Sequence, residues 1–188
     1  MTQMDEQAQI LAAQQDPRAF GALYERYVDR IYSYVYHRVG NVHDAEDLTS
    51  RVFFRAISHI GTYKDQGYPF SAWLYRIAHN LIANWHRDRS RRPLVSLEDL
   101  VISSQPEEHP ESRAQEEDDR ELLTDVLQAL DPDRRELLDL KFNEGLSNAE
   151  IGQVLGRSEG AIKSLYHRTL LQLRRELNKK GIEIDVEL

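Results

Sequence analysis

Four polar side chains near the end of the sequence recur at steps of three and four residues, which places them on one face of a helix. They are Lys163, Ser164, His167 and Arg168. A helix that inserts its N-terminal half into a DNA major groove needs such a face. Lysine and arginine neutralise phosphates, whereas serine and histidine can reach base edges. Gly160 leaves room for close approach to DNA, and Arg157 stands where it can touch a phosphate.

The residues just before this face predict a helix-turn-helix. Ser147 and Glu150 have the spacing of a capping box, Gly156 suits a left-handed helix stop, and Ser158 can cap a second helix. The expected core positions of the two helices are Ile151, Val154, Leu155, Ile162, Leu165, Tyr166, Leu170, Leu173 and Leu177. Two helices joined by so short a turn cross steeply, as in DNA-binding domains. The alternative is an ordinary helical hairpin with a solvated charged face.

A second polar stripe is predicted in the first half of the chain. It consists of Asn80, Asn84, Arg87 and Arg91, and we expect it opposite the apolar stripe of Trp73, Ile77, Leu81 and Trp85. Asparagine suits base edges because it both donates and accepts hydrogen bonds, and arginine supplies phosphate contacts. Tyr63 and Tyr68, in the preceding polar loop 61–69, can stack on unpaired bases. The alternative is an amphipathic helix with a fortuitously basic end.

Two further helices are predicted upstream of this stripe. The first begins at Asp16-Pro17 and ends at Gly40-Asn41, and Asp44, Glu46 and Asp47 open the second. The apolar stripe expected for the second comprises Ala45, Leu48, Val52, Ala56 and Ile60.

We therefore predict an all-α chain of two small domains. Residues 1–92 form the first domain, 93–120 a flexible acidic linker, 121–180 the second domain and 181–188 a tail of unknown role. In the second domain, Asp131-Pro132 starts a helix, and its expected buried positions are Leu137, Leu138 and Phe142. The linker assignment rests on charge, since 93–120 holds nine carboxylates against two arginines in a chain of net charge −8.

Several classes of protein are disfavoured by what the sequence lacks. No apolar run approaches the roughly 20 residues of a membrane span, and the N-terminus does not resemble a signal peptide. The chain has no cysteine, which fits a cytoplasmic location. His37, His79 and His86 stand outside any ligand-spaced cluster, so we expect no metal site, no cofactor and no catalytic residues.

With both halves in view, the chain resembles the extracytoplasmic-function sigma factors, small members of the main bacterial sigma family. The first block, about residues 17–92, resembles sigma region 2 through FGALYERY at 20–27, DAEDL at 44–48 and the segment 70–92. The second block, 121–177, resembles region 4. The resemblance implies three surfaces, of which the first binds core RNA polymerase and the others bind the −10 and −35 promoter elements. The residues implied to bind polymerase are Asp44, Glu46, Asp47, Leu48 and an exposed Phe54. Those implied to bind the −10 element are Tyr63, Trp73, Asn80, Asn84, Arg87 and Arg91. Those implied to bind the −35 element are Arg157, Ser158, Gly160, Lys163, Ser164, His167 and Arg168.

The sequence departs from the family pattern at a few positions. Ser50-Arg51 replaces Gln-Glu after the DAEDL motif, and Asn84 replaces a common Asp. Leu165 stands where the recognition helix usually carries Arg, which puts a phosphate contact there in doubt.

The leading hypothesis is a non-enzymatic promoter-specificity subunit that acts in the cytoplasm with core RNA polymerase and promoter DNA, and that an anti-sigma factor can inhibit. A stand-alone helix-turn-helix regulator is the alternative, although such a regulator would not need the DAEDL helix with Phe54. An all-helical enzyme is disfavoured because no nucleophile–base pair or phosphate-cradling loop is visible.

Overall fold

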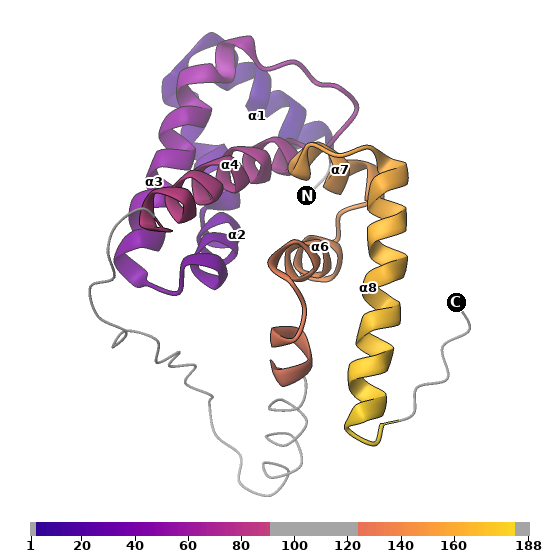
Figure 1. The fold of residues 1–188 in the computed structure, drawn as a ribbon. Helices are drawn as coiled ribbons and strands as arrows, with labels where there is room; N and C mark the ends of the chain where they lie inside the picture. The colour runs from indigo at the N-terminus through magenta and orange to yellow at the C-terminus, as the bar shows by residue number, and fades with distance from the viewer. Residues whose placement is uncertain (1–2, 91–123, 183–188) are drawn as a thin grey trace, which may run out of the picture. The chain divides into compact units, whose positions relative to one another are not determined.

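The computed structural model describes residues 3–90 and 124–182, which belong to two compact units, Met1–Ser103 and Ser104–Leu188 (Figure 1). Within these ranges the chain is helical and contains no strand, which confirms the predicted all-α class. The predicted linker, Arg91 and most of the tail lie outside the described residues. None of the described helices is long and apolar enough to cross a membrane.

The first unit is a bundle of α2, α3 and α4, with α1 packed against one end. Its helices and 3-10 turns are α1 (Gln3–Gln15), η1 (Pro17–Phe20), α2 (Gly21–Val39), α3 (Val42–His59), η2 (Ile60–Thr62) and α4 (Phe70–Ser90). Gly40, at φ 68°, ends α2 in the left-handed conformation that glycine favours, and the Asn41 side chain accepts a hydrogen bond from Asp44 N to cap α3. All five positions of the predicted α3 stripe are buried.

The start of the first unit differs from the prediction. Asp16 does act as a cap, because its side chain accepts a hydrogen bond from Arg18 N, but the segment it caps is the short 3-10 turn η1. The long helix begins only at Gly21, and α1 precedes Asp16. The sequence of α1 has little apolar periodicity, so its helical state depends on packing against η1, η2 and α2.

The second unit contains a helical segment at 124–128 followed by α6 (Pro132–Phe142), α7 (Asn148–Leu155) and α8 (Glu159–Lys179). Asp131 caps α6 through Arg134 N, as predicted. Leu137 and Leu138 are buried, but the prediction for Phe142 was wrong, because its side chain is 65% exposed. Leu140 takes the core position instead and is fully buried. Phe142 is the last residue of α6, and its ring lies 6.5 Å from that of Tyr166 on α8, which is itself only half-buried.

Candidate nucleic-acid interface

The turn between α7 and α8 has helix-turn-helix geometry with all predicted caps in place. Both hydrogen bonds of the Ser147–Glu150 capping box form, Gly156 adopts φ 65°, and the Ser158 side chain accepts from Ala161 N to start α8. The sequence did not predict that the turn depends on Gly152, a buried glycine in α7. A Cβ on Gly152 would lie 2.6 Å from the carbonyl oxygen of Arg157, so the turn folds directly over this residue. The main chain therefore fixes the direction in which α8 leaves the turn.

The face of α8 that we assigned to DNA is exposed. Its residues are Ser158, Gly160, Lys163, Ser164, His167 and Arg168, and Arg157 in the turn is exposed as well. Ser158 serves first as a helix cap. Apart from its own stretch of helix, no atom lies within 4 Å of a Cβ built on Gly160, so the rest of the protein leaves that surface open.

Leu165 faces the core and not the exposed face of α8. The absence of an arginine at this position therefore does not remove a phosphate contact from that face. Its side chain is 6% exposed, and its carbonyl oxygen accepts a hydrogen bond from the buried hydroxyl of Thr169 at 2.8 Å. Thr169 was missed as a core residue because a polar side chain interrupts the apolar pattern. Four of the predicted core positions of α8, namely Tyr166, Leu170, Leu173 and Leu177, are only half-buried among the described residues.

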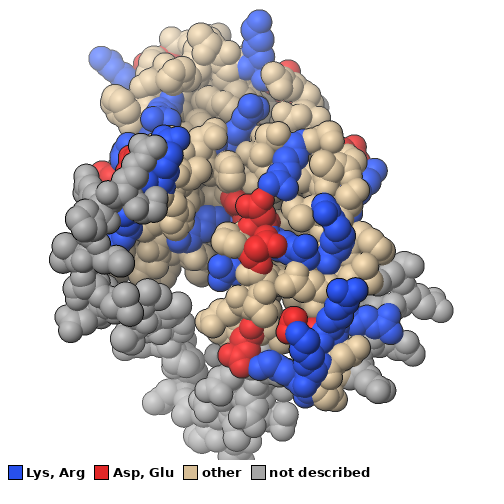
Figure 2. Space-filling model, in the orientation of Figure 1, with Lys and Arg blue, Asp and Glu red and all other residues tan. Residues whose placement is uncertain are grey.

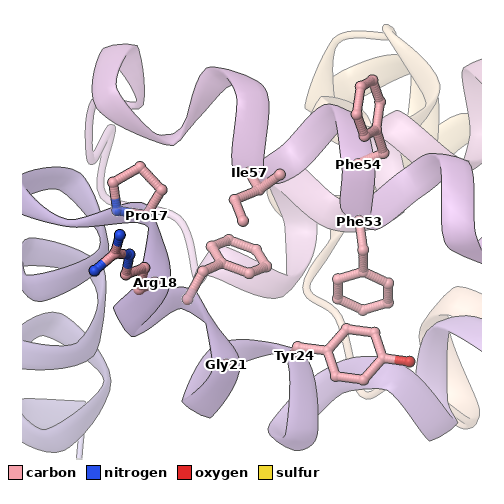
Figure 3. Close-up of a pocket in the computed structure, with 8 residues that line it drawn as sticks. Pro17, Arg18, Gly21, Tyr24, Phe53, Phe54 and Ile57 are labelled. Carbon is pink, nitrogen blue, oxygen red and sulfur yellow. The ribbon is translucent and has the colours of Figure 1, made fainter.

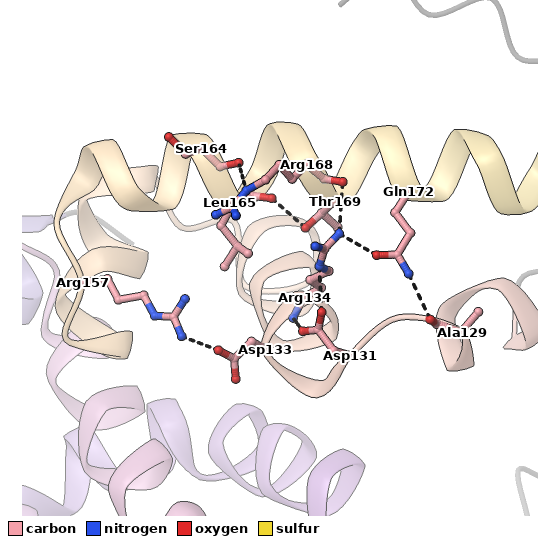
Figure 4. A network of polar contacts seen from close by, with 10 residues as sticks. All are labelled: Ala129, Asp131, Asp133, Arg134, Arg157, Ser164, Leu165, Arg168, Thr169 and Gln172. Carbon is pink, nitrogen blue, oxygen red and sulfur yellow. Dashed lines mark hydrogen bonds and ion pairs between the residues drawn. The ribbon is translucent and has the colours of Figure 1, made fainter.

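The basic residues at the start of α8 already have acidic partners within the second unit. Lys163 Nζ lies 2.7 Å from Glu159 Oε1, one helical turn earlier, and Arg157 pairs with Asp133 at the start of α6 (Figure 4). Over α6 and α8 of the second unit, Figure 2 shows carboxylates lying among the lysines and arginines. DNA phosphates would therefore have to replace these carboxylates as partners of the basic side chains.

Arg134 joins α6 to the middle of α8. Its Nη1 donates to the carbonyl oxygen of Arg168 at 3.1 Å and to Gln172 Oε1 at 2.6 Å, and its Nε forms an ion pair with Asp131 at 2.8 Å (Figure 4). Gln172 Nε2 in turn donates to the carbonyl oxygen of Ala129 at 3.1 Å. This network sets the position of α8 against the rest of the unit. The one local signal for this network in the sequence is the i, i+3 spacing of Asp131 and Arg134.

The predicted stripe on α4 lies on a different face from the one expected. Because each residue of an α-helix turns by about 100°, Asn84 lies within about 20° of Trp73 around the axis, rather than opposite to it. The core face of α4 is instead formed by Phe70, Leu74, Tyr75, Ala78, Leu81 and Ile82. Trp73 and Asn84 are half-buried, Asn80 and Arg87 are exposed, and Arg87 donates to Asn84 Oδ1 at 2.7 Å. An indole and two amides therefore share one accessible face, a combination suited to stacking on bases and reading their edges.

Tyr63 extends this face from the loop before α4. Its ring packs against Trp73 and Phe70, with centroid distances of 4.9 and 5.2 Å. Burial, with smaller contributions from Asp65 and Glu6, raises the pKa of the Tyr63 phenol to about 12. The hydroxyl therefore stays neutral, and able to donate a hydrogen bond, at alkaline pH values where an exposed tyrosine ionises.

The acidic positions predicted to bind polymerase lie along α3. Glu46 and Asp47 are exposed, and Asp44 accepts a hydrogen bond from Arg89 Nη1 at 3.2 Å. Leu48 must be withdrawn as a direct contact, because it is 1% exposed and belongs to the bundle core. Phe54 has the predicted exposure, with 72% of its side chain accessible.

An apolar groove beside Phe54 was not predicted. Phe53 and Tyr24 pack edge to face at 4.8 Å, whereas Phe54 points away from them toward solvent (Figure 3). The groove's other lining residues are Pro17, Arg18, Phe20, Gly21 and Ile57. Tyr24 lies in the apolar period of Tyr27, Ile31 and Val35 along α2, but it is 44% exposed.

Comparison with known proteins identifies the family. Residues 23–92 match the family model Sigma-70 region 2, and residues 120–173 match Sigma-70, region 4. The ECF RNA polymerase sigma factor SigW of Bacillus subtilis is 34% identical over 179 residues, which cover 86% of this chain and 90% of SigW. This chain belongs to the ECF sigma factor family.

The ECF sigma factor BldN of Streptomyces coelicolor is 42% identical over 159 residues, which cover 85% of this chain but only 60% of BldN. The chain thus spans about three fifths of that relative. Among solved structures, that of CnrH in complex with the cytosolic domain of CnrY has a TM-score of 0.62 and 26% identity, and the match covers 92% of this ECF sigma factor and 96% of CnrH.

Proposed function

We propose that this ECF sigma factor binds core bacterial RNA polymerase in the cytoplasm and directs it to promoters. The observation that carries the proposal is the presence of a solvent-exposed Phe54 beside the carboxylates of α3, in a chain whose other unit presents a helix-turn-helix. Aromatic side chains, phenylalanine included, are enriched in protein–protein interfaces, where they bury large apolar areas. A DNA-binding regulator that worked alone would have no use for an exposed Phe54.

In this proposal the three surfaces divide the work. Glu46, Asp47 and Phe54 on α3 contact the polymerase, and Asp44, which is paired with Arg89, lies at the edge of that contact. The α4 face with the Tyr63 loop captures unpaired bases of the −10 element, and the exposed face of α8 reads the −35 element. The sigma factor performs no catalysis of its own, because the polymerase supplies the chemistry.

The acidic side chains near α8 support a requirement for the polymerase. The net charge of the chain is −8, and Arg157 and Lys163 are already paired within the protein. Long-range attraction of the isolated chain to DNA phosphates is therefore weak. In the complex, binding to polymerase would provide the affinity for promoter DNA that the charges of the isolated chain do not provide.

The experiment is reconstitution with core polymerase, using Phe54→Ala and, as the matched control, Leu11→Ala, which removes an exposed apolar side chain from α1. Loss of an interface anchor weakens binding by about 2 kcal/mol, or roughly thirtyfold, so Phe54→Ala should reduce core binding by that factor while Leu11→Ala does not. Absence of both core binding and promoter-directed transcription with the unaltered chain would refute the proposal. Tight, specific binding to duplex DNA without polymerase would favour the stand-alone regulator.

A protein inhibitor fits the same surfaces. CnrH was solved bound to the cytosolic domain of CnrY, and this chain carries an apolar groove around Tyr24, Phe53 and Phe54. We infer that an anti-sigma factor can occupy it and compete with polymerase. Competition between core polymerase and a candidate inhibitor for labelled sigma factor, with Phe54→Ala weakening both complexes, tests this inference.

A further inference from the structure

Gln14, in the last turn of α1, joins that helix to the backbone of the Tyr63 loop. Its Nε2 donates to the carbonyl oxygen of Ile60 at 3.2 Å and to that of Tyr63 at 2.8 Å. The acceptors lie 46 and 49 residues further along the chain. A primary amide carries two protons, so both hydrogen bonds can form at once.

The two acceptors are Ile60, the first residue of the 3-10 turn η2, and Tyr63, the residue that follows the turn. The last carbonyls of a helix have no partner within it and need one from elsewhere. Tyr63 N already donates to Ile60 O at 3.1 Å, and the Gln14 amide adds one bond to each of these two residues. The path by which the chain leaves η2 and enters the loop is thereby fixed from α1.

The helix that carries Gln14 is itself anchored to α2. The Tyr27 hydroxyl donates to Glu6 of α1, and Arg26 Nε lies 3.9 Å from the same carboxylate. On the loop side, the Tyr63 ring rests against Trp73. The Tyr63 main chain is thus held by α1 while its ring is held by α4.

We propose that Gln14 is a positioning residue for single-stranded −10 DNA. It holds Tyr63 against Trp73, so that the loop is preorganised to accept an unpaired base on the face shared with Asn80 and Asn84. The inference rests on the proposed promoter function. None of the three predicted surfaces includes α1. The proposal therefore gives this helix a part in base recognition.

The test uses the full chain in a Trp85→Phe background, which leaves Trp73 as the only tryptophan. Gln14→Glu keeps the length of the side chain but removes both donors, and Gln14→Ala removes the whole amide. The matched control is Gln15→Ala, because Gln15 is the exposed neighbour on the same helix. The readouts are the Trp73 emission of the free protein and, for the holoenzyme, affinity for a single-stranded oligonucleotide from the non-template −10 strand of a promoter mapped with the unaltered protein.

Both Gln14 variants should shift Trp73 emission to the red and weaken oligonucleotide binding about two- to tenfold, the factor expected for one net hydrogen bond. Gln15→Ala should change neither. Core polymerase binding and the affinity for a duplex carrying only the −35 element should stay the same in all variants.

The positioning role is overturned if both Gln14 variants keep the original emission and oligonucleotide affinity, or if their loss extends equally to core binding and to the −35 duplex. If the unaltered holoenzyme itself fails to bind the −10 strand, the proposed function fails, whereas the emission readout still reports whether Gln14 holds the loop.

Discussion

Replacing Glu159 with Gln should make this sigma factor bind DNA more tightly. Glu159 Oε1 lies 2.7 Å from Lys163 Nζ at the start of α8, and the two side chains are 49% and 62% exposed. A phosphate that approaches Lys163 must displace this carboxylate and also lie near its negative charge. Glutamine keeps the size of the side chain and removes the charge.

The expected change in affinity is small, but its salt dependence is distinctive. An exposed i, i+4 ion pair is worth about 0.3–0.5 kcal/mol, so freeing Lys163 should strengthen binding about twofold at physiological salt. To the extent that Glu159 keeps Lys163 from a phosphate in the unaltered complex, the variant gains that contact, and the slope of log K against log salt concentration steepens by up to about 0.9. A carboxylate in the first turn stabilises a helix by about 0.3–1 kcal/mol, so the variant's second unit should be slightly less stable although it binds more tightly.

Fluorescence anisotropy of a labelled −35 duplex, titrated with holoenzyme over a series of salt concentrations, measures both quantities. The matched control is Glu176→Gln, which breaks a similar pair with Lys179, 2.8 Å apart at the other end of α8. Glu176→Gln should leave the slope unchanged. Unchanged affinity together with an unchanged or shallower slope for Glu159→Gln would show that Glu159 does not hold Lys163 back from a phosphate.

Three further predictions concern stability. Gly152→Ala should destabilise the second unit by about 1–3 kcal/mol in urea unfolding, because the new Cβ would lie 2.6 Å from Arg157 O; equal stability would mean that the turn is less tight than described. Leu140→Ala should cost about 2–5 kcal/mol and Phe142→Ala less than about 0.5 kcal/mol in thermal unfolding, and the reverse order would restore the original core prediction. Because the folded pKa of Tyr63 is raised from 10.0 to about 12, its contribution to stability should be complete below pH 10 and decline between pH 10 and about 12. Tyr63→Phe should abolish that decline, and a decline of the same size in the variant would assign it to another group.

Local signals in the sequence predicted several of the helix boundaries. The caps at Asp131 and Ser147 and the glycines Gly40 and Gly156 that end helices act over a few residues, so spacing along the chain is enough to find them. The same holds for the buried stripe of α3, which has one core-facing side.

Errors arose where packing between helices decides the outcome. Tyr24 and Phe142 fit an apolar period, yet both are exposed, whereas the polar Thr169 is buried. For Leu165 the apolar period correctly predicted a core position, whereas the comparison of residue types with the family pattern suggested a lost DNA contact. The assignment of Asn84 to the face opposite Trp73 was an error of helical phase, which a count of 100° per residue would have avoided.

Interactions between distant segments were not accessible from the sequence. The bonds from Gln14 to the Tyr63 loop and from Arg134 to α8 span 46 to 49 and 34 to 38 residues, and neither has a characteristic local motif. The ion pair between Arg157 and Asp133 likewise depends on how α6 packs beside the turn. Such contacts determine how the exposed faces are presented, although sequence signals predicted most of those faces.

The most direct test of the central claim compares the DNA binding of the free chain with that of its complex with core polymerase on genomic fragments. The account predicts weak, salt-sensitive binding by the free chain. It also predicts that the complex starts transcripts from a set of promoters with shared −35 and −10 sequences, which are lost with Phe54→Ala. Specific, tight binding by the free chain, with no change in transcription start sites when polymerase is added, would contradict the account.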